Sequence, residues 1–251
     1  MKSFMGWVGR KNNLKKRILN HFPEHYGRYI EVFGGAGWVL FAKEKKQGQM
    51  EVYNDLNSNL VNLFRCIKYH PEAVRQELVW TLQSREMFFD SLSQLNTVGM
   101  TDIQKAARFL YVIKNSFGST GETFATCPRG LPNTLDYLAK VSERLRGVII
   151  ENKHYPHILK TYDRADALFY LDPPYVGTEN YYEADFAPEE HTALAEMLHS
   201  IKGKFVLSYN DCPLIRKLYS DCKIDAFSRK ENLSGTGNNN SDFKELIIKN
   251  F

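Results

Sequence analysis

No stretch of the chain's 251 residues approaches the roughly 18 consecutive apolar residues that a membrane-spanning helix requires. The basic segment of residues 1–17 also lacks the apolar centre of a secretory signal peptide. We find no internal repeat and no low-complexity linker. These absences predict a soluble, cytoplasmic protein without a membrane partner.

Cysteine is also scarce. The four copies, Cys66, Cys127, Cys212 and Cys222, show none of the paired spacings of structural zinc sites, and the seven histidines are scattered. We therefore expect free thiols in a reducing compartment and no metal site. The net charge excludes few classes of function, because a value of +4 and a pI near 8.7 permit nucleic-acid binding without requiring it.

The most informative segment that is present is Asp172-Pro173-Pro174-Tyr175, which directly follows the apolar run Ala167–Leu171. The run predicts a buried strand, so the segment lies at a strand's carboxyl end, where open α/β sheets bind ligands. It offers a carboxylate acceptor, two prolines that stiffen the backbone without a competing N–H, and an aromatic face. This set suits a planar ring that carries an amino group, although Asp-Pro-Pro is also ordinary turn chemistry.

The chemistry of such an amine explains why these residue types are useful together. An exocyclic amine on a purine or pyrimidine is a poor nucleophile, because its lone pair is delocalised into the ring. If Asp172 and the Pro173 carbonyl both accept hydrogen bonds from one NH2 group, the nitrogen is biased toward tetrahedral geometry and its lone pair can point at an electrophile. Tyr175 would hold the ring by stacking.

A glycine-rich turn lies between a predicted strand and a predicted helix. Tyr29–Phe33 reads as a short buried strand, Gly34–Gly37 follows, and Trp38–Lys46 has a helical pattern. Such glycines let the backbone approach a ligand and direct helix N-terminal amides at it. A second strand, Met50–Tyr53, leads to Asp55, about 20 residues past the glycines, where an acidic residue can hold ribose hydroxyls. Together these features predict a pocket for an adenosine-containing cofactor.

With these motifs the chain resembles DNA adenine-N6 methyltransferases of the Dam type, which belong to the D12 class and the alpha group and carry the cofactor motif before the catalytic one. Four separated matches, in the family's order, cover most of the chain. They are Gly6-Trp7-Val8-Gly9-Arg10-Lys11, the loop 31–37, Asn54-Asp55-Leu56-Asn57 and Tyr170–Tyr175. Weaker similarity extends through 207–211 and 234–240.

The resemblance implies S-adenosyl-L-methionine as cofactor and methyl transfer to the N6 amine of an adenine flipped out of double-stranded DNA. The positions that match the family's cofactor contacts and cofactor loop are Trp7, Lys11, Phe33, Gly35, Gly37, Asp55 and Asp172. The positions that match its catalytic motif are Asp172, Pro173, Pro174 and Tyr175. The N-terminal segment departs from the commonest pattern, with Gly6 where a lysine is usual and Arg10 where a glycine is usual.

The middle of the chain shows a different pattern. Residues 71–82, 86–95 and 102–117 have helical spacing of apolar residues, whereas strand and helix signals alternate before and after them. In similar enzymes this region reads the DNA target, so we expect an inserted recognition subdomain. For any single charged residue in this region, a position on a solvent-exposed helix face is as good an explanation as a contact with DNA. The candidates for phosphate or base contacts are Lys105, Arg108, Lys114, Asn115 and Arg129.

We therefore predict an α/β fold, a Rossmann-like S-adenosylmethionine-dependent methyltransferase sheet with helices on both faces and an inserted, mainly helical DNA-recognition subdomain. The catalytic domain would comprise residues 1–70 and 147–251, and the recognition subdomain residues 71–146. The final run, Phe243–Ile248, is expected to form an edge strand. Further strands are expected at 147–150, 168–171, 205–208 and 224–227, and helices at 188–201 and 213–219.

Several alternatives remain open. The same chemistry suits the exocyclic amine of cytosine, so N4-cytosine methylation is the nearest of them. Methylation of RNA or of a protein amide is another, although related enzymes more often place Asn or another residue before the two prolines. A nucleotide-binding module without catalysis would need only the glycine loop and Asp55. For the oligomeric state, monomeric action on DNA is the simplest default.

Overall fold

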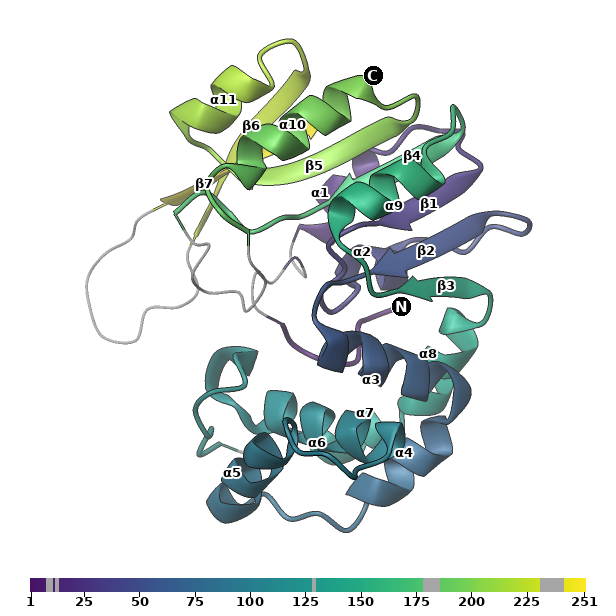
Figure 1. Cartoon of the computed structure of the whole chain (residues 1–251), viewed down its shortest axis with the longest axis vertical. Coiled ribbons are helices and arrows are strands. Elements are labelled where there is room, and N and C mark those ends of the chain that lie inside the picture. The colour runs from purple at the N-terminus through teal and green to yellow at the C-terminus, as the bar shows by residue number, and fades with distance from the viewer. Residues whose placement is uncertain (8–10, 12–13, 128–129, 178–185, 231–241) are drawn as a thin grey trace. The chain divides into compact units, whose positions relative to one another are not determined.

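The structure is a computed structural model that describes residues 1–7, 11, 14–127, 130–177, 186–230 and 242–251. Its seven strands form a mostly parallel sheet flanked by helices (Figure 1), which confirms the predicted α/β, Rossmann-like class. The chain divides into two compact units. Unit 1 comprises Met1–Lys16 and Gly34–Asn152, and unit 2 comprises Arg17–Phe33 and Lys153–Phe251.

Unit 2 contains five strands in the order β1-β4-β5-β7-β6. Their bounds are Arg28–Glu31 for β1, Ala167–Leu171 for β4, Lys204–Asn210 for β5, Lys223–Lys230 for β6 and Asp242–Lys249 for β7. The first three run parallel, with Tyr29 opposite Leu168 and Phe169 opposite Phe205. Every residue of β4 is buried, as expected of a parallel strand covered on both faces.

The predicted edge position of the last strand is wrong. β7 lies between β5 and β6 and pairs antiparallel with both, so β6 takes the outer position of unit 2. Residues 245–248 are buried, and Leu246, Ile247 and Ile248 supply the apolar side chains that an interior strand needs. Position along the chain does not determine position in a sheet, because the connection from β5 to β6, which contains α11, leaves one place between these strands that the last strand fills.

Helices and helix-flanking residues cover both faces of the strands of unit 2. On one face lie α9 (Tyr155–Tyr162), α10 (Glu190–Ser200) and α11 (Pro213–Leu218), and Figure 1 shows α9 and α10 in front of β4 and β5. Phe205 contacts Tyr219, which follows α11. On the other face Tyr170 contacts Phe22, which follows α1 (Lys15–Asn20). Successive strand residues face opposite sides, so these contacts belong to different faces.

Unit 1 contains the parallel pair β2 (Met50–Asn54) and β3 (Val148–Glu151), together with most of the helices. The predicted central helices are confirmed as α4 (Pro71–Leu78), α5 (Arg85–Gln94) and α6 (Asp102–Asn115), each close to its expected range. Thr101 and Gln104 form a reciprocal capping box at the start of α6, which explains its sharp beginning. The other elements are α2 (Trp38–Ala42), α3 (Ser58–Tyr69), α7 (Leu131–Leu135), α8 (Leu138–Leu145) and the 3-10 turn η1 (Phe117–Ser119).

A buried ion cluster ties α8 and the end of α2 to β2. The Arg144 guanidinium donates to both carboxylate oxygens of Glu51, at 2.7 and 2.8 Å, and the Lys43 ammonium donates to the same carboxylate at 2.9 Å. All three side chains are buried. Burial by itself would raise the pKa of Glu51, but the hydrogen bonds and charges of Arg144 and Lys43 outweigh it and lower that pKa.

Among the described residues, every helix is too short or too polar to cross a bilayer. The four cysteines are free, as expected.

Candidate active site

The glycine turn of unit 1 has a backbone conformation that only glycine adopts easily. Gly35 and Gly37 have φ values of 50° and 65°. A Cβ on Gly35 would lie 2.9 Å from the indole of Trp7, and a Cβ on Gly34 would lie 2.3 Å from the ring of Tyr53. The predicted residues Gly35 and Trp7 are therefore packed against each other with no room for a side chain between them.

Asp55 holds this turn in place. The Gly35 N–H donates to one Asp55 carboxylate oxygen at 2.8 Å, and the Asn57 N–H donates to the other at 2.8 Å. The Tyr53 hydroxyl donates to the Gly35 carbonyl at 2.6 Å. Burial raises the pKa of the Asp55 carboxyl above its ordinary value. The hydrogen bonds from backbone N–H groups act to lower this pKa but do not outweigh burial. Because a carboxylate has about four lone-pair sites, Asp55 keeps acceptor capacity for a ligand's hydroxyl groups.

The remaining predicted residue of unit 1, Lys11, is 4% exposed, and its carbonyl accepts the N–H groups of Leu14 and Lys15. The other residues between Trp7 and Leu14 lie outside the described part of the chain. The Trp7 ring lies 6.0 Å from that of Phe109 on α6, so the N-terminal motif contacts the helical segment.

Asn152 was not predicted and braces the same site. Its amide N–H groups donate to the carbonyls of Asp55 and Leu56 at 2.9 and 3.0 Å, and its amide oxygen accepts from Ser58 at 2.9 Å. Asn152 directly follows β3, at the carboxyl end next to that of β2. The sequence feature that could have identified Asn152 as a site residue is its position as a polar residue directly after a predicted strand.

In unit 2, the Asp172–Tyr175 segment directly follows β4, as predicted. Pro173 and Pro174 are buried, whereas Asp172 and Tyr175 are half-buried at the end of the strand. This places the carboxylate and the aromatic ring where they remain accessible to a ligand, on a backbone stiffened by the prolines.

Asn210, the last residue of the neighbouring strand β5, fixes the backbone just after this segment. Its amide oxygen accepts the Val176 N–H at 3.1 Å, and its amide nitrogen donates to the Val176 carbonyl at 3.1 Å. Sequence reasoning did not assign it a site role. Two reciprocal bonds to the N–H and the carbonyl of one residue restrain the two peptide units on either side of Val176, so Asn210 is placed to hold the end of the segment in position.

A row of aromatic rings connects the other predicted residues of unit 2. Phe33 lies 5.8 Å from Tyr155 and 5.9 Å from Phe186, measured between ring centroids. Phe186 lies 5.1 Å from His191, whose Nδ1 is 2.7 Å from the hydroxyl of Tyr209. The ring of Tyr209 is in turn 6.0 Å from that of Tyr175. Phe33 and Tyr175 therefore belong to one packed aromatic cluster, although they are far apart in sequence.

The predicted DNA-contact residues differ from one another in burial and in hydrogen bonding. The Arg108 guanidinium donates to Gln94 at 3.1 Å and lies 3.7 Å from the carboxylate of Glu77. Asn115 is 2% exposed, donates to the Tyr111 carbonyl and lines a cavity of about 490 Å³ among α4, α6 and α7. Lys105 and Lys114 are half-buried on α6, and Arg129 lies outside the described residues.

An exposed aromatic residue in the same segment was not predicted. Phe117 on η1 is 63% exposed, next to Gly118 with φ 64°. The Phe117 N–H donates to the Thr123 carbonyl at 2.7 Å, and the Ala125 N–H donates to the Asn115 carbonyl at 2.7 Å. These bonds hold a narrow loop that presents the ring outward.

Comparison with known proteins identifies the family. Residues 7–233 match the D12 class N6 adenine-specific DNA methyltransferase family, a range that contains both motifs described above. The chain belongs to this family. The protein is accordingly an enzyme that methylates adenine in DNA, which favours the adenine prediction over N4-cytosine methylation and over a non-catalytic module.

Individual relatives agree with this assignment. The Type II methyltransferase M1.LlaDCHI of Lactococcus lactis is 27% identical across all of this chain and 96% of its own length. The DNA adenine methylase of Haemophilus influenzae is 22% identical, covering 97% of this chain and 92% of the relative. The modification methylase StsI of Streptococcus sanguinis is 24% identical over 72% of this chain, which is 30% of that longer protein.

Proposed function

We propose that the methyl donor of this enzyme is S-adenosyl-L-methionine and that the glycine turn of unit 1 holds it. The observation that carries the proposal is the bond between the Gly35 N–H and Asp55, since it fixes a Cβ-free backbone beside a carboxylate that retains acceptor capacity. A carboxylate at this position suits ribose hydroxyls, and Trp7 and the buried Lys11 complete a set that fits an adenosine-containing cation with a carboxylate tail. The bound donor supplies an electrophilic methyl group on a sulfonium.

The adenine amine is the nucleophile in the proposed reaction. Asp172 and the Pro173 carbonyl accept hydrogen bonds from the N6 amine and turn its lone pair out of the ring plane, while Tyr175 stacks on the base. Methyl transfer would form the N6–carbon bond and break the carbon–sulfur bond, so that the donor would leave as a neutral thioether and the methylated amine would lose one proton to solvent. The contribution of the protein is mainly the positioning of two reactants, which can supply about 7–11 kcal/mol in favourable cases.

Substitution Asn210→Ala is expected to lower kcat by about ten- to a hundredfold, because a small displacement of a reacting group is enough to cost that much. The affinity for the methyl donor should change little, since the Asn210 side chain bonds to the Val176 backbone that follows the catalytic segment. Steady-state kinetics with saturating DNA and donor would measure both quantities.

Asn250→Ala is the matched control. Asn250 makes the same kind of two-bond clamp at the opposite end of β5, to the Phe205 N–H and the Gly203 carbonyl. If both variants lose activity equally, the effect of Asn210 is one of strand stability and its positioning role is refuted.

Asp55→Ala should weaken binding of the methyl donor by about ten- to a hundredfold, which corresponds to the loss of hydrogen bonds to a charged acceptor. Titration calorimetry with S-adenosyl-L-methionine would measure it, with the exposed Asp90→Ala of the same unit as control. Unchanged donor affinity in Asp55→Ala would refute the assigned role.

We further propose that residues 71–146 form the subdomain that recognises DNA and that the target adenine is flipped out of the duplex before reaction. The support is Lys105 and Lys114 on α6 and the outward ring of Phe117, since cations bind phosphates and exposed aromatic rings stack on bases. Arg129 stays a candidate contact. Arg108 and Asn115 would have to exchange their present hydrogen bonds for DNA contacts.

Lys105→Ala is expected to weaken DNA binding to about the same degree on all sequences and to reduce the slope of log affinity against log salt by about 1. Fluorescence anisotropy with duplex DNA at several salt concentrations would measure this. Lys160→Ala, on the exposed side of α9, is the control. An unchanged salt slope would remove Lys105 from the phosphate contacts.

The reaction itself is tested by incubating the protein with labelled S-adenosyl-L-methionine and unmodified plasmid DNA, followed by nucleoside analysis. Label in N6-methyladenine supports the proposal, whereas donor binding without label in any nucleoside contradicts it. We also propose that the enzyme acts as a monomer and, as a protein that modifies DNA, works in the cytoplasm.

A further inference from the structure

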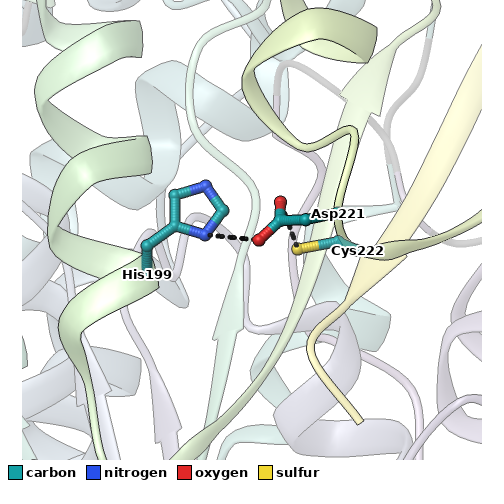
Figure 2. Close-up of side chains that lie close together, drawn as sticks. All are labelled: His199, Asp221 and Cys222. Carbon is teal, nitrogen blue, oxygen red and sulfur yellow. Dashed lines mark hydrogen bonds and ion pairs between the residues drawn. The ribbon is translucent and has the colours of Figure 1, made fainter.

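Three side chains with metal-ligating atoms lie together in unit 2, and none of them is used in the proposed reaction. Figure 2 shows His199 in the last turn of α10 facing Asp221 and Cys222 in the turn before β6. One ligating atom from each residue lies within 4.8 Å of the others. An imidazole nitrogen, a carboxylate and a thiol are the donor types that zinc accepts.

The hydrogen bond on the far side of the imidazole determines which nitrogen can act as a ligand. Nε2 of His199 is 3.0 Å from the Leu218 carbonyl, which can only accept, so Nε2 carries a proton. In the neutral ring the lone pair is then on Nδ1, and Nδ1 faces the Asp221 carboxylate at 3.4 Å. Two acceptors that face each other in this way need a proton or a cation between them.

This arrangement is the one that metal-bound histidines use, because a backbone carbonyl on the second nitrogen fixes both the tautomer and the ring orientation. The separations lie close to those of a tetrahedral ion. His199 Nδ1 is 3.4 Å from Asp221 Oδ2, and Cys222 Sγ is 3.7 Å from Asp221 Oδ1. Bonds of about 2.0–2.3 Å give tetrahedral edges of about 3.3–3.7 Å, so side-chain rotation within this cluster would bring one oxygen, the nitrogen and the sulfur around one ion.

The backbone supports the cluster and solvent can reach it. The Cys222 N–H donates to the Tyr219 carbonyl at 3.0 Å, which closes the turn that carries the two adjacent ligands. The side chains of His199 and Asp221 are 35% and 69% exposed, so an ion has a path to them.

We propose that His199, Asp221 and Cys222 form a site for a divalent transition metal of the zinc type. Three protein ligands leave one position of a tetrahedral ion for water. The mixed nitrogen, oxygen and sulfur donors disfavour magnesium and calcium, which prefer oxygen alone. On binding, the Cys222 sulfur forms a bond to the metal and its proton is released to solvent. The ion would join the end of α10 to the start of β6.

Cobalt(II) is the probe that tests this site, because a cobalt–thiolate bond produces a charge-transfer absorption that a nitrogen–oxygen site lacks. The full-length protein, treated with a chelator and kept reduced, is titrated with Co²⁺ and then with Zn²⁺. We expect one equivalent of Co²⁺ to produce the thiolate band and Zn²⁺ to abolish it. Cys222→Ser should lose the band, and His199→Gln should weaken Co²⁺ binding by at least about tenfold.

Cys127→Ser is the matched control, since Cys127 is the exposed thiol of unit 1. It should keep the full band. Absence of the band in the unmodified protein means that His199 and Asp221 form only an ordinary surface ion pair, and the proposal fails. It also fails if the band survives in Cys222→Ser or disappears in Cys127→Ser. Retained DNA methylation by the variants would verify that they are folded.

Discussion

Asp172→Ala is expected to lower the rate of methyl transfer by about 10²–10⁴-fold, the range seen when one essential polar group is removed from an active site. Without the carboxylate, only the Pro173 carbonyl would remain to draw the adenine lone pair out of the ring. Asp172 is half-buried at the end of β4, so truncation leaves the apolar residues of the strand packed. The single-turnover rate, with enzyme in excess over DNA and donor saturating, would measure the effect.

Asp172→Asn separates charge from shape in the same experiment. The amide keeps one acceptor oxygen but carries no negative charge, so its rate should fall between those of Asp172 and the alanine variant. DNA affinity should change little in both variants, because the proposed phosphate contacts lie in another segment. A folded Asp172→Ala protein that methylates DNA at the original rate would overturn the assignment of this residue.

Glu51→Ala is expected to lower the free energy of unfolding by about 3–5 kcal/mol, because it leaves Lys43 and Arg144 buried without their counter-charge. The cluster ties α8 to β2, so its loss should also loosen the attachment of the helical segment of unit 1. Urea denaturation followed by circular dichroism would measure the change. Glu72→Gln is the control, since Glu72 pairs with Arg75 on an exposed helix face. This substitution should lower the free energy of unfolding by less than about 1 kcal/mol.

The same cluster predicts a dependence of stability on pH. The pKa of Glu51 is lower in the folded protein than in the unfolded chain, where it is about 4.3. Its contribution to stability is therefore fully present above about pH 4.3 and is lost as the pH falls through the folded-state pKa. Glu51→Gln should flatten this acid limb of a plot of unfolding free energy against pH. An identical acid limb in the variant would contradict the lowered pKa.

Local sequence determined much of this protein. The apolar run before Asp172 predicts a buried strand, and the spacing of apolar residues in 102–117 predicts a helix, because both patterns depend on contacts within a few residues. The glycine turn and Asp55 were likewise predictable, since a positive φ and a close approach restrict the residue type at those positions. The family's motifs use the same local chemistry.

Tertiary structure decided what depends on residues that are distant in sequence. The interior position of β7, the clamp of Asn210 on Val176 and the buried pairing of Glu51 with Arg144 each join separate elements. The His199, Asp221 and Cys222 cluster is of the same kind, because no spacing rule relates a helix end to a later turn. Sequence patterns report which face of an element is apolar. Which polar side chains then meet is determined by how the elements pack, and that is known only from their arrangement in space.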